Sequence, residues 1–365
     1  MKAAVFLHPQ SPLEIRTYPE TEPTPGMAVV ELVSTGICGT DIHIWDGALA
    51  LQGPMILGHE LLGRVRTLGS GATHDGQGQA LISGDLVAVN VVEPCQQCIL
   101  CIEGGAASCL HLLESLTYTR SPEEPPHFHG GFAEINYSPA RYLMKVPSVL
   151  PADVVGAFLC AGPTVIRGVA YAGGISPGST VVVQGAGPVG LFAVLYAKQQ
   201  GAGRVVLLGS CSHPLRLELA TALGADEVMD IRQTTQEERH ARILALTAGR
   251  GADLILEGTG NPEAITEGLG LLRNRGIYIM TGQYSNRGAV AIPTHVITFN
   301  ALQIFGSAQF TSDDRTAYFS FLTRVPTLWE TIRRVVTDRF TLDNINTAFS
   351  RTHDGAAIKT LIVPG

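Results

Sequence analysis

Short apolar runs separated by turn residues dominate the first 150 residues. Two examples are AVVELVSTGIC at 28–38 and DLVAVNVV at 85–92, both rich in the β-branched side chains that favour strands. Gly and Pro recur between such runs and mark turns. The pattern predicts a mostly antiparallel β domain over residues 1–163, with a long Pro-rich loop at 117–129.

A different pattern begins at about Thr164, where short β-rich runs alternate with helix-like segments. The strand candidates are residues 180–185, 204–209, 252–258 and 276–282. The helix candidates are residues 191–201, 215–225, 241–249 and 262–272. Strands that alternate with helices at this spacing need right-handed crossovers, so we predict an α/β, doubly wound parallel sheet over 164–304. The pattern loosens again over 305–365.

Composition and charge exclude several classes of function. The 365 residues suffice for two domains, and only 16% of them are charged. Twenty-five basic and thirty-two acidic residues give a net charge of -7, which argues against nucleic-acid partners and anionic membrane surfaces. The uncharged stretch between Arg167 and Lys198 is long enough to span a membrane, but its Pro and Gly residues fit a strand, a turn and a helix better.

Four of the seven cysteines stand close together in the pattern C-x2-C-x2-C-x7-C. The amino terminus has no secretory signal, so we expect a cytoplasmic protein, in which cysteines indicate metal or catalytic groups before disulfides. Four thiolates fill a tetrahedral Zn²⁺ shell and leave no open position. We therefore predict a structural zinc in a lobe at about 94–110, with an iron–sulfur cluster as the alternative. Its ligands would be Cys95, Cys98, Cys101 and Cys109.

A glycine-rich motif lies between a predicted strand and a predicted helix. The motif GAGPVG at 185–190 has the spacing G-x-G-x-x-G, and its context is that of a dinucleotide-binding turn rather than a plain structural turn. Gly185 would make the tight turn, Gly187 would admit a pyrophosphate, and Gly190 would allow helix and strand to pack closely. With Pro188 and Val189, these residues are our candidates for binding NAD or NADP.

The choice between the two nucleotides depends on the end of the strand at 204–209. An acidic residue about twenty positions beyond the motif usually holds the ribose of NAD, but here the strand is followed by Ser210, Cys211 and Ser212. Without a carboxylate to repel it, a 2′-phosphate could bind. Ser210 and Arg216 are candidate phosphate contacts, although an arginine on a helix surface is more often simply solvated.

Three further residues, Cys38, His59 and Cys160, could each be ordinary core residues when taken alone. The motifs around them are more specific: GICGTDIH at 36–43, GHE at 58–60, GGFAE at 130–134, the four-cysteine lobe and GAGPVG. Together, over almost the whole chain, they resemble the zinc-dependent alcohol dehydrogenases of the medium-chain dehydrogenase/reductase (MDR) family. The resemblance implies a GroES-like catalytic domain, interrupted by a Rossmann domain and completed by 305–365, with the active site in the cleft between them.

The resemblance also assigns roles around a second, catalytic zinc. Cys38, His59 and Cys160 look like its ligands, since three ligands and one open position mark a catalytic site. Glu60 resembles the family's carboxylate that approaches the metal during ligand exchange. Asp41 resembles the acid that orients the ligand histidine, with a loop cap as the alternative.

Three other residues carry roles by resemblance. Thr40 and His43 match the family's proton relay, the alternative being a packed threonine and a solvated histidine. Lys359 stands where the family has a basic residue near the cofactor phosphates and the inner carboxylate, the alternative being a surface lysine. Trp45 either lines the substrate pocket or packs in the core. His127 and His129 could bind a metal as H-x-H, but we expect them to belong to a flexible polar loop.

The expected reaction is the reversible oxidation of an alcohol, preferably secondary and medium-sized, with hydride transfer to NAD(P). A polyol or sugar dehydrogenase of the same family is the alternative, although Cys160 stands where such branches often have Glu. From another class, the alternative is a zinc- and nucleotide-binding sensor without turnover. A homo-oligomer, dimer or tetramer, is implied only by the family.

Overall fold

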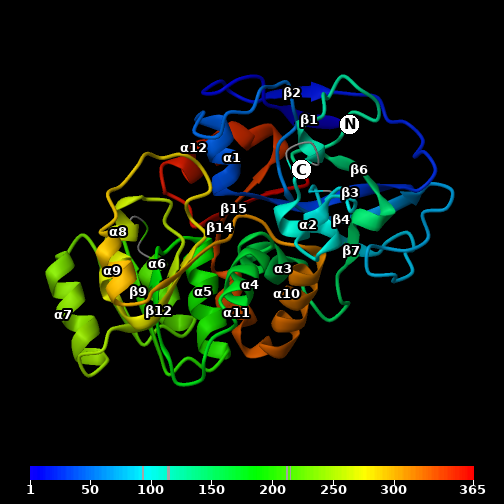
Figure 1. Ribbon diagram of the computed structural model, residues 1–365. Helices are drawn as coiled ribbons and strands as arrows, with labels where there is room; N and C mark the ends of the chain where they lie inside the picture. Colours follow the sequence, from blue (N-terminus) through cyan, green and yellow to red (C-terminus); the bar gives the residue numbers. More distant parts are fainter. Residues whose placement is uncertain (93, 113–115, 211–212, 214) are drawn as a thin grey trace. The chain divides into compact units, whose positions relative to one another are not determined.

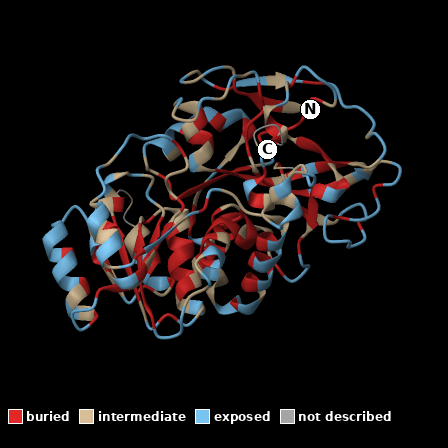
Figure 2. Cartoon of the chain, viewed as in Figure 1, coloured by how far each residue is buried: buried red, intermediate tan, exposed pale blue. Residues whose placement is uncertain are grey.

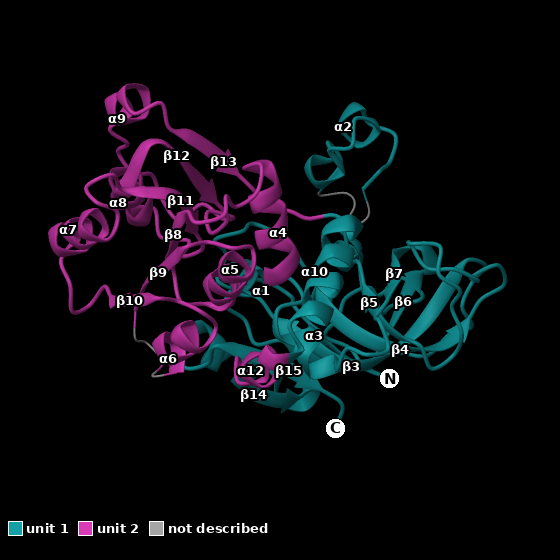
Figure 3. Ribbon diagram, turned by 90° about the horizontal axis from the view of Figure 1, so that it is seen from below, with its two compact units in different colours: residues 1–160, 311–326, 336–365 teal, residues 161–310, 327–335 magenta. Residues whose placement is uncertain are grey.

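The computed structural model describes residues 1–92, 94–112, 116–210, 213 and 215–365 (Figure 1). The chain folds into two compact units, coloured in Figure 3. Unit 1 comprises residues 1–160, 311–326 and 336–365, and unit 2 comprises residues 161–310 and 327–335. We expected divisions at 163 and 304. They lie at 160 and 310 because the helix that starts at Ala161 and the strand that ends at Gly306 belong to unit 2.

Unit 1 is built on a seven-stranded sheet in which the long β3 is central. The path runs β14-β15-β3-β4-β5-β7, and β6 also pairs with β3. All of these pairs are antiparallel except β14 with β15, so the prediction of a mostly antiparallel domain is confirmed. A separate pair joins β1 to β2. The strands are β1 (Lys2–Val5), β2 (Glu14–Thr17), β3 (Met27–Ile37), β4 (Glu60–Leu68), β5 (Leu86–Val89), β6 (Ile135–Pro139), β7 (Leu143–Lys145), β14 (Val336–Thr341) and β15 (Lys359–Val363).

Helices of unit 1 are mostly short. The α-helices are α1 (Gly39–Trp45), α2 (Ile99–Ile102), α3 (Ala152–Ala157), α10 (Ser312–Arg324) and α12 (Ile345–His353). The 3-10 turns are η1 (Ala106–Ser108), η2 (Thr117–Thr119), η3 (Ala140–Tyr142) and η5 (Leu342–Asn344). The expected Pro-rich loop at 117–129 therefore begins with one 3-10 turn, and its remaining residues form no helix or strand.

Unit 2 is a six-stranded sheet with every pair parallel, in the order β10-β9-β8-β11-β12-β13. The strands are β8 (Thr180–Gln184), β9 (Arg204–Gly209), β10 (Glu227–Asp230), β11 (Ala252–Glu257), β12 (Leu272–Met280) and β13 (Gln303–Gly306). The chain moves outward from β8 to β10 and then returns to β11 on the other side of β8, which makes the carboxyl ends of β8 and β11 the switch point where such sheets bind ligands. The predicted doubly wound sheet is confirmed.

Helices connect the strands of unit 2 as the alternation predicted. They are α4 (Ala161–Tyr171), α5 (Pro188–Gln199), α6 (Leu215–Ala222), α7 (Gln236–Leu246), α8 (Glu263–Leu271), α9 (Thr294–Phe299) and α11 (Trp329–Arg333), and η4 (Pro326–Leu328) lies at the boundary. Every residue of β8 is buried, which explains its unbroken apolar sequence. Figure 2 shows strands of both units largely buried, with exposed residues on outer helix faces such as α7.

The uncharged stretch at 168–197 consists of part of α4, all of β8 and most of α5. Across the described ranges of the chain, none of the helices combines the length and apolarity that crossing a membrane would need.

Candidate metal centres and dinucleotide pocket

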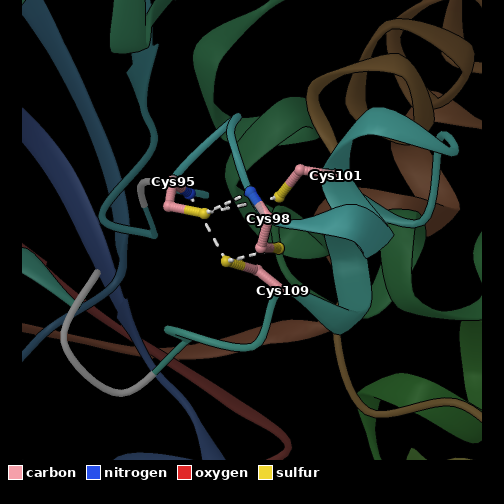
Figure 4. Close-up of side chains that lie close together, drawn as sticks. All are labelled: Cys95, Cys98, Cys101 and Cys109. Atoms are coloured by element: carbon pink, nitrogen blue, oxygen red, sulfur yellow. Dashed lines mark hydrogen bonds between the residues drawn. The ribbon is translucent and has the colours of Figure 1, made fainter.

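Four cysteine side chains of unit 1 converge on one point (Figure 4). Their sulfur atoms all lie within 4.8 Å of one another, and Cys95 with Cys101 and Cys98 with Cys109 are each 4.0 Å apart. An S₄ tetrahedron around zinc has edges of about 3.8 Å, because Zn–S bonds are about 2.3 Å long. Backbone N–H groups, first that of Leu110, lower the pKa of Cys98 to about 6, whereas burial raises the pKa of Cys101 to about 12. Without a metal, Cys98 is therefore the thiol of the two that more readily becomes a thiolate. The cluster fits a four-coordinate zinc.

The lobe around this cluster has little apolar core to hold it together. Helix α2 contains no buried residue, and Ile99, Ile102 and Leu110 are 56%, 69% and 65% exposed. A segment that buries so little cannot offset its loss of chain entropy by hydrophobic contacts. A metal bound by four thiolates would supply the missing stabilisation.

A second group of potential ligands forms where three segments of unit 1 meet. Cys38 follows β3 and caps α1, His59 precedes β4, and Cys160 lies beyond α3. Their ligand atoms, together with a carboxylate oxygen of Glu60, lie within 4.8 Å of one another, and the sulfurs of Cys38 and Cys160 are 4.0 Å apart. The hydrogen bond with Cys160 holds the pKa of Cys38 well below its ordinary value. Two sulfurs and one imidazole fit a catalytic zinc with an open position.

Asp41 orients this group through both of its carboxylate oxygens. It is 1% exposed, and its Oδ1 lies 3.3 Å from His59 Nδ1 while accepting a hydrogen bond from Gly58 N at 3.2 Å. Its Oδ2 accepts from Cys38 N at 2.9 Å, which also caps α1. Burial lowers the pKa of His59, but Asp41 and Cys38 outweigh it and raise that pKa. Because Asp41 faces Nδ1, Nε2 of His59 is the nitrogen left for a metal.

In unit 2 the first three residues of the glycine-rich motif, 185–187, line a cavity of about 490 Å³ at the switch point. Gly185 adopts φ +108°, and a Cβ on Gly190 would stand 1.8 Å from the Gly185 carbonyl oxygen, so both positions require glycine. Gly187 has no atom within 3.8 Å of such a Cβ and leaves the loop open to a ligand. Pro188 is the first residue of α5, whose amino end can bind a pyrophosphate.

The candidate specificity residues line the same cavity. Ser210 and Arg216 both contribute to its wall, and Arg216 Nη1 donates to Ala186 O at 3.1 Å on the glycine-rich loop. Burial lowers the pKa of Arg216. The interpretation of Arg216 as an ordinary solvated arginine is therefore wrong. Cys211 and Ser212, also named in the sequence prediction, lie outside the described residues.

Comparison with known proteins agrees with these sites. Residues 24–148 match the alcohol dehydrogenase GroES-like domain, and residues 188–324 match the zinc-binding dehydrogenase domain. The chain is 33% identical to 5-exo-hydroxycamphor dehydrogenase of Pseudomonas putida over 365 residues, which covers 99% of this chain and 98% of that protein. A solved alcohol dehydrogenase of Thermotoga maritima is 30% identical, with a TM-score of 0.93 over 100% of this chain and 99% of that one.

The chain belongs to the zinc-dependent alcohol dehydrogenases of the MDR family. It is an oxidoreductase that transfers hydride reversibly between a small-molecule alcohol and NAD(P), with a dependence on zinc, as the sequence predicted. Sorbitol dehydrogenase of Bacillus subtilis is a further relative, 28% identical over 372 residues that cover 100% of this chain and 97% of that protein. The alternative of a sensor without turnover does not agree with a family of dehydrogenases.

In this dehydrogenase Lys359 is not a surface lysine. It is 3% exposed, and its Nζ donates to both Glu60 oxygens at 2.6 Å and to Ile37 O at 3.2 Å. Burial lowers the pKa of a lysine, but Glu60 outweighs that effect and raises the pKa of Lys359. With three acceptors inside unit 1, the ammonium has no N–H left for a cofactor phosphate. The structure thus supports the expected proximity to the inner carboxylate and argues against a phosphate contact.

The two relay candidates lie on α1. Thr40 and His43 are three positions apart and both half-buried. Thr40 Oγ1 lies 3.9 Å from Cys38 Sγ, so the hydroxyl adjoins the proposed ligand group. Trp45, at the end of the helix, donates from Nε1 to Ser11 O at 2.8 Å, and its ring lies 6.5 Å from that of Phe349. Of its two interpretations, the structure supports core packing.

His127 and His129 lie in the predicted loop, but they are not the solvated side chains that a polar loop implied. Both are buried, at 9% and 6% exposure, and each bonds a carbonyl oxygen of its own loop, Pro122 O at 2.9 Å and Glu124 O at 3.2 Å. The ring of His127 also stacks on Tyr18 at 5.2 Å. Among the described residues they join no metal-ligating cluster. The Pro-rich composition predicted the loop, but nothing in it indicated that the ring of His127 would stack on Tyr18 and help bury the loop.

Sequence reasoning missed part of the dinucleotide cavity. Gly258 and Thr259, which follow β11, line it together with the glycine-rich loop, as do Gln236 and Arg239 from α7. Gly258 and Thr259 could have been predicted, because β11 lies beside β8 in a doubly wound sheet and the carboxyl ends of both strands form the switch point. The α7 residues could not, since nothing in their sequence shows which way they face.

Proposed function

We propose that this dehydrogenase oxidises a medium-sized secondary alcohol to a ketone, reversibly. The observation that supports the chemistry is the convergence of Cys38, His59 and Cys160 within one group that holds three ligands and leaves a fourth position for substrate. The support for a secondary alcohol comes from the relatives. Hydroxycamphor carries its hydroxyl on a ring carbon, and xylulose is a ketose whose reduction at the ketone gives a secondary alcohol.

Two zinc ions per chain complete the proposal, one held by Cys38, His59 and Cys160 and one by the four-cysteine lobe. A zinc ion bound by the first group would act as a Lewis acid that lowers the pKa of the alcohol. Around it, Asp41 would hold the His59 ring in position from 3.3 Å, and the Thr40 hydroxyl, 3.9 Å from Cys38 Sγ, would accept the alcohol proton. His43, three residues further along α1, would exchange that proton with solvent, a role for which an imidazole is suited.

The relay predicts a specific loss. Thr40→Val keeps the shape of the side chain but removes the hydroxyl, so kcat should fall by about 100-fold or more, the usual contribution of a positioned proton-transfer group, while the zinc content stays at two. The exposed Thr316 on α10 provides the matched control, since Thr316→Val makes the same change at a solvent-facing side chain outside both ligand groups. Near-normal turnover of Thr40→Val would refute the relay.

For the nucleotide we infer that the cavity accepts NADP. Ser210 and Arg216 line the cavity wall, and the sequence after β9 has Ser210, Cys211 and Ser212 in place of the acidic residue that usually holds the ribose of NAD. We expect kcat/KM to favour NADPH, and Arg216→Met to raise the KM for NADPH about tenfold or more while leaving that for NADH nearly unchanged, because only NADPH carries the extra phosphate. A preference for NAD above tenfold in the unaltered enzyme would contradict this inference.

The substrate class is tested by a panel of alcohols and ketones, followed by the ultraviolet absorbance of reduced nicotinamide. Cyclic and branched secondary alcohols should give a higher kcat/KM than sorbitol or xylitol. The polyol alternative has support from relatives named sorbitol dehydrogenase and D-xylulose reductase, at 28% and 29% identity. A polyol at the top of the panel would favour that alternative, and a fully zinc-loaded protein that turns over none of the panel would contradict the main proposal.

We also propose a cytoplasmic enzyme that works as a homo-oligomer. The six described cysteines are free thiols grouped as metal ligands, which fits a reducing compartment. The oligomer rests on family membership alone. Sedimentation of the zinc-loaded protein would test it, and a monomer at micromolar concentration would contradict it.

A further inference from the structure

A buried ion pair spans three strands of unit 1. Glu60 is the first residue of β4 and Lys359 the first residue of β15, and these strands lie on opposite sides of β3. Gly36, near the end of β3, pairs with Glu60 on one side and with Leu361 on the other. The two charged side chains therefore meet across the face of the strand that separates them.

Gly36 is what permits the meeting. A Cβ at this position would stand 2.6 Å from Glu60 Oε2, 2.6 Å from Lys359 Nζ and 2.7 Å from Lys359 Cε. Any other residue would force the two side chains apart, since a Cβ carbon does not approach non-bonded heavy atoms this closely. The absence of a side chain at Gly36 thus creates the space that the ion pair fills.

The pair lies beside the proposed catalytic ligands. Glu60 adjoins His59 in the chain, and one of its oxygens falls within 4.8 Å of the ligand atoms of Cys38, His59 and Cys160. A carboxylate so placed could bind a metal held by those three residues and take the position that the substrate needs. Something must favour another partner for Glu60.

Lys359 is that partner. Its ammonium contacts both oxygens of Glu60 at 2.6 Å, and the side chains of Lys359 and Glu60 are only 3% and 2% exposed. A carboxylate buried to this degree cannot turn to water, and it stays charged only beside a cation. If the ammonium were removed, two cations would be left for Glu60: the buried guanidinium of Arg315, which also interacts with its charge, and a metal in the adjoining group, beside which its oxygen already lies.

We propose that Lys359 is a positioning residue that holds Glu60 away from the catalytic metal and so keeps the fourth coordination position open for the alcohol. The proposal rests on the proposed role of Cys38, His59 and Cys160 as metal ligands. It gives Lys359 a role within unit 1 that requires no contact with cofactor or substrate.

The test uses the whole enzyme with Co²⁺ in the catalytic site, because visible bands of cobalt weaken and shift when a fifth ligand joins a four-coordinate ion. Lys359→Met has nearly the same length without the charge. We expect its cobalt bands to lose intensity as Glu60 binds, and kcat to fall by about 10- to 100-fold, the usual effect of altering a partner of a metal site. Lys359→Arg, which keeps the cation, should retain most of the wild-type spectrum.

The double variant Lys359→Met with Glu60→Gln decides between coordination and general damage. It has lost both the Lys359 ammonium and the Glu60 carboxylate, so the four-coordinate cobalt spectrum should return. A wild-type spectrum in folded Lys359→Met, or a double variant that still shows the altered bands, would overturn the proposal. If Lys359→Met does not fold, a crystal structure of the zinc-loaded wild-type enzyme decides instead: Glu60 on Lys359 supports the proposal, and Glu60 on zinc overturns it.

The failure of the underlying ligand assignment would be seen separately. If Cys38, His59 and Cys160 are not the ligands, Co²⁺ will give no sulfur-to-cobalt charge-transfer band that disappears in Cys38→Ser. That result would remove the proposed metal site itself, whereas an unchanged spectrum in Lys359→Met would remove only the role of Lys359. Neither readout depends on finding the right alcohol.

Discussion

At the scale of single residues, the site depends on side chains that satisfy several partners at once. Oδ1 of Asp41 faces His59 Nδ1 and accepts a hydrogen bond from the backbone N–H of Gly58, and its Oδ2 accepts one from the backbone N–H of Cys38. A carboxylate can do this because it has only acceptors. The amide of an asparagine at this position would instead turn its NH₂ group toward one of these N–H donors, where no acceptor is available. The charge of Asp41, and not only its size, is therefore needed to orient His59.

Asp41→Asn should weaken the binding of zinc by Cys38, His59 and Cys160, while the four-cysteine lobe keeps its zinc. We expect about a 10- to 100-fold loss of zinc affinity, measured by competition with a chelator that reports the two ions separately. Asp75→Asn is the matched control, because Asp75 is also buried and accepts hydrogen bonds from three backbone amides but lies outside both ligand groups. Equal zinc affinity in the two variants would refute the orienting role.

The role of a site residue could be predicted where it followed from the residues next to it in the sequence. Gly190 was assigned from strand, turn and helix that adjoin it, and the structure shows the close packing expected. Lys359 was left between a phosphate contact and a surface residue, because its partner is 299 positions away in Glu60. Only the register of β15, β3 and β4 brings the two together, and no local pattern encodes that register.

At the scale of elements, strand-helix alternation was enough to predict the parallel sheet, but boundaries followed rules that apolar runs do not reveal. Helix α7 begins at Gln236, five residues before the predicted start, because Thr235 and Glu238 form a capping box and the first turn is charged. Strand β13 was missed, since its residues are mostly exposed at the sheet edge. Apolar periodicity finds buried elements and overlooks those that face water.

The turn between β8 and α5 gives a prediction at this scale. Gly190→Ala would place a Cβ 1.8 Å from Gly185 O, a clash with backbone that the loop can relieve only by moving away from its strand. We expect nucleotide affinity to fall about tenfold or more and the enzyme to lose about 1–3 kcal/mol of stability, as for other overpacked positions.

Gly270→Ala is the matched control for that variant. Gly270 lies in α8 with open space around its Cβ position, and alanine is the better helix former by about 1 kcal/mol. It should leave the nucleotide Kd unchanged and stability equal or slightly higher, as followed by fluorescence titration and urea unfolding. If Gly190→Ala binds nucleotide as tightly as Gly270→Ala does, the close packing of the motif is not needed for binding.

At the scale of the whole molecule, the two kinds of site are divided between the units. All seven proposed zinc ligands lie in unit 1, whereas every residue that lines the dinucleotide cavity lies in unit 2. The chain starts in unit 1, forms most of unit 2 and then returns, apart from residues 327–335, so that β14 and β15 join a sheet begun about 300 residues earlier. The sequence showed that the strand–helix alternation begins at about Thr164 and ends near residue 304. Only the family resemblance indicated that the last segment rejoins the first domain.

The four ligands of the structural zinc come from one short segment, 95–109, which contains no ligand of the catalytic group and no residue of the dinucleotide cavity, so this zinc can be removed separately. Cys98→Ser takes one thiolate from a lobe that has almost no core, so the lobe should lose its metal and its order while zinc content falls from two to one per chain. We expect a lower Tm and new proteolytic cleavage between residues 95 and 109, with the cobalt spectrum of the catalytic group and the nucleotide Kd unchanged. Ile102→Ser, at a 69% exposed position of the same lobe, should show none of these effects. A Cys98→Ser protein that keeps two zinc ions, or that loses nucleotide binding along with the lobe, would contradict a purely structural role for these four cysteines.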